Sequence, residues 1–222
     1  MLRKVSLNDI TDGKFYGLND MVKVGCNDCE GCSACCHSMG ASILIDPLDV
    51  YHLMGNLNLS FEELLCDKIE LNLVDGVILP NLKMVGESES CTFLNSQGRC
   101  SIHAFRPGLC RLFPLGRYYS NHSFQYILQV HECKKGNPSK VKVRKWIDTP
   151  KINAYEKFIV EWHYFIINVQ NLLKEITDED KRKQIIMYLL KSFFMTPYDF
   201  KHEFYEQFNE RLSLVKVNIA DL

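Results

Sequence analysis

The sequence predicts an α+β fold, in which a small cysteine-rich domain with short hairpins and helices precedes a C-terminal helical segment. Ten cysteines lie unevenly along the 222 residues, and none follows Cys133. Turn residues and short strand-like runs dominate up to residue 148, whereas long amphipathic patterns follow it. The expected domains are therefore residues 1–148 and residues 149–222.

Two short helices are expected early in the first domain. Asp46-Pro47-Leu48-Asp49 is typical of a helix start because proline suits the first turn, and Gly55 is the expected end. Ser60-Phe61-Glu62-Glu63 has the serine-to-glutamate spacing of a capping box, which predicts a second helix. Cys66, next to two leucines in that helix, is expected to be a small buried side chain.

Three hairpins are expected where turn residues separate strand-like runs. Asp75-Gly76 is the strongest signal, because it supplies the positive backbone angles of a two-residue turn. Asn95 to Gly98 and Ser120 to His122 separate the other two pairs of runs. The paired runs are 69–74 with 77–79, 91–94 with 100–102, and 117–119 with 124–130.

The second domain is expected to form three helices that pack as a bundle. The first starts near Asp148 or Thr149, and its apolar stripe consists of Ile152, Tyr155, Ile159, Trp162, Ile166, Val169, Leu173 and Ile176. The second starts at 177–180, and the third starts at Thr196-Pro197 and carries Phe200, Phe204 and Phe208. These stripes are expected to pack against one another; a protein partner bound by this helical tail is the alternative.

Charge and composition exclude several classes of protein. The 26 basic and 27 acidic residues leave a formal charge of -1, so no general attraction to nucleic acid or anionic lipid is expected. The apolar stretch 158–169 is too short and too interrupted for a membrane span. Residues 1–9 are not followed by the apolar core of an export signal, so we expect a cytoplasmic protein. In a reducing compartment, dense cysteine more often serves metal ligation or catalysis than cross-linking.

The cysteines form two sets. Five thiols lie within the eleven residues from Cys26 to Cys36, and two-residue spacers let a turn direct successive sulfurs towards one centre. Four of them have the C-x2-C-x2-C-x3-C spacing of bacterial ferredoxins: Cys26, Cys29, Cys32 and Cys36. The second set is Cys91, Cys100, Cys110 and Cys133, whose first pair lies at the two feet of an expected hairpin.

Several motifs together resemble the YkgJ-type cysteine-cluster family, named for CxxCxxCC. They are Cys29-x2-Cys32-x2-Cys35-Cys36, the run 43–49, Cys91-Thr-Phe-Leu, 98–102 and Arg106-Pro-Gly-Leu-Cys-Arg-Leu-Phe-Pro114. The resemblance covers about residues 24–135 and implies a domain that chelates zinc or iron. The flagellin lysine N-methylases look like distant relatives with a similar cluster, which in them is associated with iron–sulfur.

The expected ligands are Cys29, Cys32, Cys35, Cys36, Cys91, Cys100, Cys110 and Cys133, with Cys26 as an additional candidate. Eight sulfurs suffice for two four-sulfur sites or for one shared polynuclear site. Side chains of adjacent residues diverge on a strand and lie about 100° apart on a helix, so Cys35 and Cys36 favour two centres or an extended cluster. The cofactor is an iron–sulfur cluster (4Fe-4S) or zinc, because both accept tetrahedral sulfur; the ferredoxin-like spacing favours iron–sulfur.

Five residues are candidates to surround these ligands: Arg106, Arg111, His37, His131 and Asp49. Four thiolates around a divalent ion leave a net charge of -2, so cations are expected close by, and arginine can donate hydrogen bonds to sulfur. Surface salt bridges are the alternative for the arginines, and helix capping explains Asp49 without chemistry. The basic run 134–145 is expected to be a solvated linker.

The sequence thus predicts a cytoplasmic protein whose partners are metal ions. A cluster-dependent enzyme, related to lysine N-methylation or redox chemistry, and a zinc-structured interaction scaffold are the alternatives. No phosphate-binding loop of the GxxxxGK[ST] type and no GxGxxG turn occurs, which weighs against the common nucleotide-dependent folds. Catalytic residues are not identified.

Overall fold

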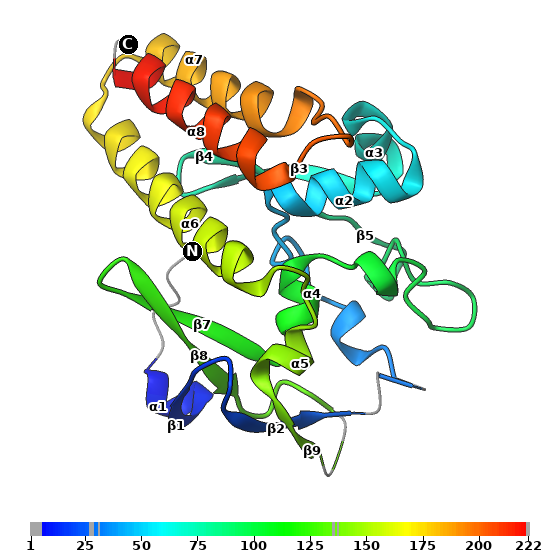
Figure 1. Ribbon diagram of the computed structural model, residues 1–222. Helices are drawn as coiled ribbons and strands as arrows, with labels where there is room; N and C mark the ends of the chain where they lie inside the picture. Colours follow the sequence, from blue (N-terminus) through cyan, green and yellow to red (C-terminus); the bar gives the residue numbers. More distant parts are fainter. Residues whose placement is uncertain (1–5, 27–28, 31, 135, 137, 221–222) are drawn as a thin grey trace. The chain divides into compact units, whose positions relative to one another are not determined.

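The computed structural model describes residues 6–26, 29–30, 32–134, 136 and 138–220, and it confirms the α+β class (Figure 1). The chain divides into two compact units, each built from two stretches of sequence. Unit 1 comprises residues 1–40 and 84–160, and unit 2 comprises residues 41–83 and 161–222. This division differs from the expected domains 1–148 and 149–222. That these two segments are separate domains remains a prediction.

Unit 1 is built from short strands and helices around a three-stranded antiparallel sheet of order β1-β8-β7 (Figure 1). Two smaller antiparallel pairs, β2-β9 and β5-β6, complete its strands. The strands are β1 Thr11–Tyr16, β2 Met21–Gly25, β5 Met84–Val85, β6 Ser90–Cys91, β7 Leu115–Ser120, β8 Ser123–Gln129 and β9 Ser139–Lys142. The helices are α1 Leu7–Ile10, η1 Ala34–Cys36, η2 His103–Phe105, α4 Gly108–Leu112, α5 Val143–Ile147 and the first part of α6 Ile152–Glu175.

The expected hairpin around 120–122 is present as β7-β8. Asn121 and His122 have φ values of 48° and 54°, which match the two positive angles of a tight two-residue turn. The hairpin around 95–98 is shorter than expected, because only one isolated bridge joins Leu94 to Cys100. Two hydrogen bonds from the amides of Gln97 and Arg99 to the Asn95 side chain hold its turn.

A buried tyrosine connects the sheet of unit 1 to the start of α6. Tyr126 of β8 is 2% exposed, and its hydroxyl donates a 2.8 Å hydrogen bond to Oε1 of Glu156. Burial and this hydrogen bond raise the pKa of Tyr126 well above the usual tyrosine value, so the hydroxyl keeps its proton. Arg117 of β7 donates in turn to the Tyr155 hydroxyl at 2.9 Å.

Phenylalanine in place of Tyr126 is expected to destabilise the protein by about 1.5 to 3 kcal/mol, because the half-buried Glu156 carboxylate loses a charge-assisted hydrogen bond. Urea unfolding measures the change. Tyr118→Phe is the matched control, since Tyr118 on β7 is 38% exposed. Equal stability of the Tyr126 variant and the wild type would show that the hydrogen bond makes no net contribution.

Unit 2 combines two helices and a hairpin from the first stretch with the helices of the C-terminal stretch. Its elements are α2 Pro47–Leu57, α3 Phe61–Asp67, β3 Ile69–Val74, β4 Val77–Leu82, the rest of α6, α7 Glu179–Leu190, η3 Lys191–Met195 and α8 Phe204–Ala220. The segment η3 is a π-helical turn that continues α7. Within unit 2, α7 and α8 run side by side (Figure 1).

Capping boxes determine where both early helices of unit 2 begin. Asp46 and Asp49 form a capping box at the start of α2, and Ser60 and Glu63 form another at the start of α3. The helix α2 runs beyond the expected stop at Gly55 and ends at Asn58, which takes the left-handed conformation with φ of 53°.

The expected hairpin at Asp75-Gly76 is confirmed in full. The strands β3 and β4 pair from Ile69 with Leu82 to Val74 with Val77, which leaves the two-residue turn between them. Asp75 and Gly76 have φ values of 48° and 92°, as a turn of this length requires.

The apolar stripes of the C-terminal helices form the core of unit 2. Trp162 of α6 lies at ring-centroid distances of 5.0 Å from Phe193 and 6.2 Å from Phe208. Phe193 and Phe208 are both fully buried. The expectation that the stripes pack within the chain is thereby confirmed for these residues; a protein partner for the tail remains a prediction.

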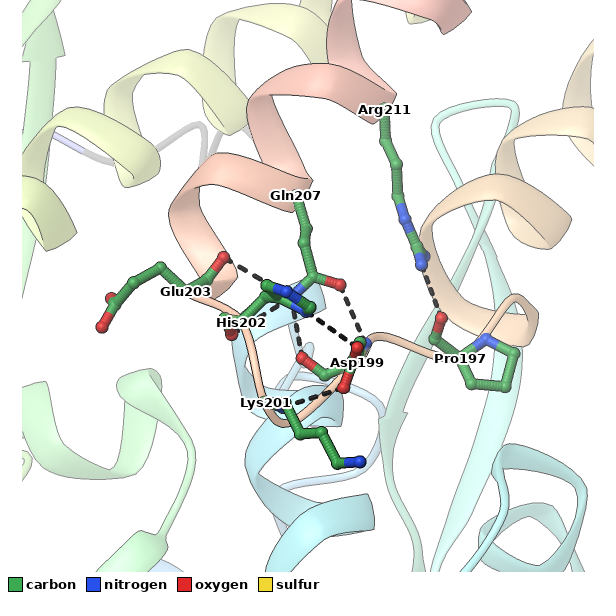
Figure 2. A network of polar contacts seen from close by, with 7 residues as sticks. All are labelled: Pro197, Asp199, Lys201, His202, Glu203, Gln207 and Arg211. Carbon is green, nitrogen blue, oxygen red and sulfur yellow. Dashed lines mark hydrogen bonds and ion pairs between the residues drawn. The ribbon is translucent and has the colours of Figure 1, made fainter.

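The third C-terminal helix begins later than expected, at Phe204 instead of Thr196-Pro197. Figure 2 shows the polar network that holds the preceding turn. The Asp199 carboxylate accepts 2.8 Å hydrogen bonds from the Lys201 amide and from Nδ1 of His202, while Gln207 bonds both the amide and the carbonyl of Asp199. Arg211 donates to the carbonyl of Pro197 at 2.6 Å. These side chains satisfy backbone groups that a helix from Pro197 would have paired.

No helix in the described part of the chain combines the length and apolar composition that crossing a membrane requires.

Candidate metal centre

The first cysteine set lies on a loop of unit 1 that two tight turns shape. The amide of Cys32 donates to the Cys29 carbonyl at 3.0 Å, and the amide of Cys36 donates to the Ser33 carbonyl at 2.8 Å. Cys29 has a φ of 57°, a left-handed conformation that is uncommon for a residue with a Cβ. Each of the two hydrogen bonds brings together residues that are three positions apart.

Cys26 lies with this set although the family motif begins after it. Its side chain is buried, and its Sγ is 3.4 Å from Sγ of Cys29. Burial and the neighbouring Cys26 sulfur raise the pKa of the Cys29 thiol to about 12. Two sulfurs this close repel each other as thiolates unless a cation lies beside them, which makes Cys26 a fitting additional ligand.

A small cavity of about 20 Å³ brings five cysteines together: Cys26, Cys29, Cys32, Cys35 and Cys133. This volume holds about one water-sized sphere. Phe113, Pro114 and Trp146 supply an apolar wall. Cys133, about a hundred residues away in sequence, is thus brought to the first set.

The adjacent Cys35 and Cys36 do not diverge as the sequence suggests. On the 3-10 helix η1 their sulfurs are hydrogen bonded to each other. This bond lowers the pKa of the Cys35 thiol to about 7 and, together with burial, raises the pKa of Cys36. The pair therefore presents two neighbouring sulfurs instead of two separated ones.

Three cysteines of the second set interact electrostatically with Cys36 or with one another. Cys110 and Cys91 are close enough to act electrostatically on Cys36, and Cys100 acts in the same way on Cys91. Burial raises the pKa of both Cys91 and Cys100. Cys91 ends β6, Cys100 forms the bridge to Leu94, and Cys110 lies on α4. The charge interactions thus link the second cysteine set to the first through Cys35 and Cys36.

Backbone amides point at two sulfurs of the second group. A backbone hydrogen bond from Phe93 reaches Cys91, and one from Ile102 reaches Cys100, each two residues further along the chain. Both bonds lower the pKa of the thiol they reach, because an N–H donor favours the thiolate. This is the form of cysteine that binds metal.

The comparisons with known proteins agree with this geometry. Residues 28–135 match the sequence model of the CxxCxxCC family, described as a "putative zinc- or iron-chelating domain". This segment is a CxxCxxCC domain. Among curated proteins and solved structures, none matches the chain significantly. The resemblance seen in the sequence is thereby confirmed for the family, whereas the likeness to flagellin lysine N-methylases remains a prediction.

Arg106 is a cation of the CxxCxxCC domain that acts electrostatically on three of its thiols. Its positive charge lowers the pKa of Cys29, Cys35 and Cys100. Its Nη1 contacts Nε2 of His103, while its buried Nε has no hydrogen-bond partner among the described residues. A thiolate-bound centre would give this orphaned donor an acceptor, which is a structural reason to expect one.

Arg111 has a different role from Arg106. It donates from Nε to the carbonyl of Arg106 at 3.2 Å and from Nη1 to that of Asp148 at 3.1 Å, and Nη2 contacts the carbonyl of Ala104. Arg111 therefore fixes the backbone that carries Arg106. Sequence reasoning treated the two arginines alike, since spacing does not reveal which guanidinium meets carbonyls.

His37 connects the thiol loop of the CxxCxxCC domain to β6. Its Nδ1 lies 3.0 Å from Oγ of Ser90, and its Nε2 lies 3.4 Å from Oγ of Ser33. His131, by contrast, is exposed at a turn with φ of 66°.

Asp49 and Cys66, both in unit 2, make local hydrogen bonds within their helices. Asp49 accepts a 3.2 Å hydrogen bond from the Asp46 amide in the capping box of α2. Cys66 is exposed, not buried as expected, because it lies on the outer side of α3, where it donates to the Glu62 carbonyl at 3.4 Å.

The donor set fits zinc or iron, although the sulfurs are not arranged around an ion as they stand. Within the described residues, no three His, Cys, Asp or Glu side chains converge closely enough to hold one metal. The donors are nevertheless soft sulfur atoms, half-buried, with amide donors and Arg106 beside them. Thiolate donors of this kind select zinc, copper(I) or iron–sulfur over magnesium or calcium.

Proposed function

We propose that this chain is a cytoplasmic metal-binding protein that holds its metal through cysteine thiolates in two adjacent centres. Nine cysteines of unit 1 carry the proposal, and we assign them to two groups by the lining of the small cavity and by the charge interactions between thiols. The first group is Cys26, Cys29, Cys32 and Cys133, around the small cavity. The second group is Cys36, Cys91, Cys100 and Cys110. Cys35 lies at the cavity and beside Cys36, where it can bridge the two centres.

The burial of the cysteines supports the proposal. Cys26 and Cys91 are buried, and the other seven cysteines of unit 1 are half-buried. Clustered thiols that are shielded from water are suited to metal ligation. The eight expected ligands are all members of unit 1, and Arg106 contributes the compensating charge.

More specifically, we propose that the metal is held as an iron–sulfur cluster. The spacing of Cys26, Cys29, Cys32 and Cys36 supports it, because ferredoxins use the same spacing. A bound cluster would supply one-electron chemistry, while the chain would contribute its thiolates, the amides of Phe93 and Ile102, and the charge of Arg106. These groups favour the charged sulfurs and limit the access of water to them.

Zinc is the second candidate, favoured by one observation. Five cysteines line the small cavity, and a tetrahedral zinc site needs only four of them. A ligand-complete zinc site would organise the fold without redox chemistry. A cluster-dependent enzyme and a zinc-structured scaffold remain predictions from the sequence.

Elemental analysis with a visible absorption spectrum tests the metal, on protein prepared without oxygen. Iron with acid-labile sulfide and a broad brown absorbance identify the cluster. A colourless sample with stoichiometric zinc identifies the second candidate. Protein that contains neither metal after expression in medium supplied with both contradicts the proposal.

Serine variants test the two-centre arrangement. Cys133→Ser is expected to remove the metal of the first centre and Cys91→Ser that of the second, so each leaves part of the metal and the double variant leaves almost none. Cys66→Ser is the matched control, because Cys66 is exposed in unit 2. Metal content per chain is the measurement. If either single substitution removes all metal, the sulfurs serve one shared centre.

A further inference from the structure

A second feature of unit 1 has no part in the thiol site. An open groove of about 940 Å³ lies along β1 and β2, with contributions from β8 and β9. Its lining includes three lysines, Lys14, Lys23 and Lys140, and two aromatic residues, Phe15 and Tyr16. The volume is at the upper end of the range for small-molecule sites.

Strand pairing places like charges opposite one another in this groove. Lys23 of β2 pairs directly with Lys140 of β9, and Lys142 pairs with Met21 two residues along. Because side chains alternate along a strand, Lys23, Lys140 and Lys142 share one face. The other face of β2 carries Val22 and Val24, which are buried. Like charges directly opposite each other destabilise a strand pair, so the sheet carries a cost that a bound anion would remove.

The carboxylates of the groove form no ion pair with its lysines within the described residues. The Asp12 carboxylate accepts from the Tyr16 hydroxyl at 2.5 Å, and the Asp20 carboxylate accepts from the Gly17 amide at 2.7 Å. The side chains of Lys14, Lys23 and Lys140 are exposed, and their ammonium groups have no ion-pair or hydrogen-bond partner in the described part of the chain. Three positive charges therefore face two negative ones, which leaves the groove with a net positive charge and three unpaired ammonium groups.

An exposed ring lies beside these charges. Phe15 lines the groove and is 47% exposed, although a phenylalanine ring normally avoids water. Tyr118, 5.4 Å from it between ring centroids, supports the ring from the side. A planar heterocycle could stack on Phe15 while an attached phosphate chain reaches Lys23 and Lys140.

We propose that this groove binds a nucleoside polyphosphate, with the phosphates on the cross-strand lysine pair and the base on Phe15. The lysines act as point-charge phosphate ligands, and the ring adds the contact that distinguishes a nucleotide from inorganic polyphosphate. The proposal is independent of the metal centre, since no cysteine lines the groove.

Calorimetric titration of the full, metal-loaded chain tests the proposal with ATP, inorganic triphosphate and adenosine at about 50 mM salt, where charge screening is weak. ATP is expected to bind more tightly than triphosphate, and adenosine more weakly than either. Metal content is measured before and after each titration, so that removal of metal by the phosphates is not mistaken for binding. Absence of saturable ATP binding below about 1 mM overturns the proposal, because affinity that weak corresponds to no specific site.

Paired variants locate the site. Lys23→Gln with Lys140→Gln is expected to weaken ATP binding at least about tenfold, since charge-assisted hydrogen bonds are lost. Lys216→Gln on α8, exposed and in unit 2, is the control and should leave ATP binding unchanged. Phe15→Ala should weaken binding of ATP but not of triphosphate. Equal loss in the control, or equal affinity of the wild type for ATP and triphosphate, contradicts the proposal.

The unfolding temperature provides a second measurement. If the lysine pair stabilised the sheet, its removal would lower this temperature, whereas the proposal expects no decrease. The double lysine variant should unfold at the same temperature as the wild type or at a higher one, because the opposed charges are gone. A lower unfolding temperature would mean that the pair stabilises the sheet, and the inference from opposed charges would then fail.

Discussion

Serine in place of Cys110 is expected to lower the metal content and to reduce the thermal unfolding temperature by about 10 °C or more. Apparent binding energies of roughly 10 to 16 kcal/mol for zinc in small fingers show how much folding free energy thiolate ligation can supply. In a chain of this size, each kcal/mol lost shifts the unfolding temperature by about 2 to 4 °C, so a loss of only part of that energy suffices. The Cys32→Ser variant should behave in the same way.

The effect depends on the position of Cys110 in the fold. It lies on the five-residue helix α4, which is too short to be stable alone. Its thiol also interacts electrostatically with that of Cys36 on η1. Ligation would tie these two short elements together. Calorimetry with metal analysis measures both quantities, and Cys66→Ser is the control. A Cys110 variant that keeps its metal and its unfolding temperature would exclude Cys110 as a ligand.

Alanine in place of Phe193 is expected to cost about 3 to 5 kcal/mol of unfolding free energy while the metal content stays the same. Phe193 is fully buried in unit 2, and its ring contacts Trp162, Phe165 and Phe208. Removing a large aromatic side chain from such a core leaves a cavity that its neighbours fill only in part. The expected ligands all belong to unit 1, whereas Phe193 belongs to unit 2.

Urea unfolding gives the free-energy change for Phe193→Ala, and metal analysis of the folded variant gives the second readout. Leu214→Ala is the control, since Leu214 on α8 is 63% exposed and its truncation should change stability by about 0.5 kcal/mol or less. If the folded Phe193 variant lost its metal, metal binding by unit 1 would depend on the core of unit 2.

Local signals in the sequence predicted much of the fold. The Asp75-Gly76 turn and the Ser60 capping box each depend on residues within a few positions of one another, and both were predicted correctly. The predicted start of α8 was wrong because Gln207 and Arg211, which lie three and seven residues after the first residue of the helix, satisfy the backbone of the preceding turn. Asp148 likewise ends α5 in the left-handed conformation and does not cap α6.

The composition of the candidate site was easier to predict than its arrangement. Cysteine spacing predicted which thiols belong to the candidate site, because a chain rarely has five cysteines within eleven residues for any other purpose. Spacing did not predict the hydrogen bond between Cys35 and Cys36, nor the amides of Phe93 and Ile102 that reach sulfur. These features depend on backbone conformation over single turns, and the approach of Cys133 to the loop depends on the tertiary fold.

The interleaved order of the two units has a consequence for biosynthesis. The ribosome releases the segment with Cys26 to Cys36 early, whereas Cys133 emerges about a hundred residues later. At translation rates of roughly 5 to 20 residues per second, the early thiols spend about 5 to 20 seconds without their distant partner. During that interval the nascent chain depends on cellular reductants to protect these sulfurs from oxidation.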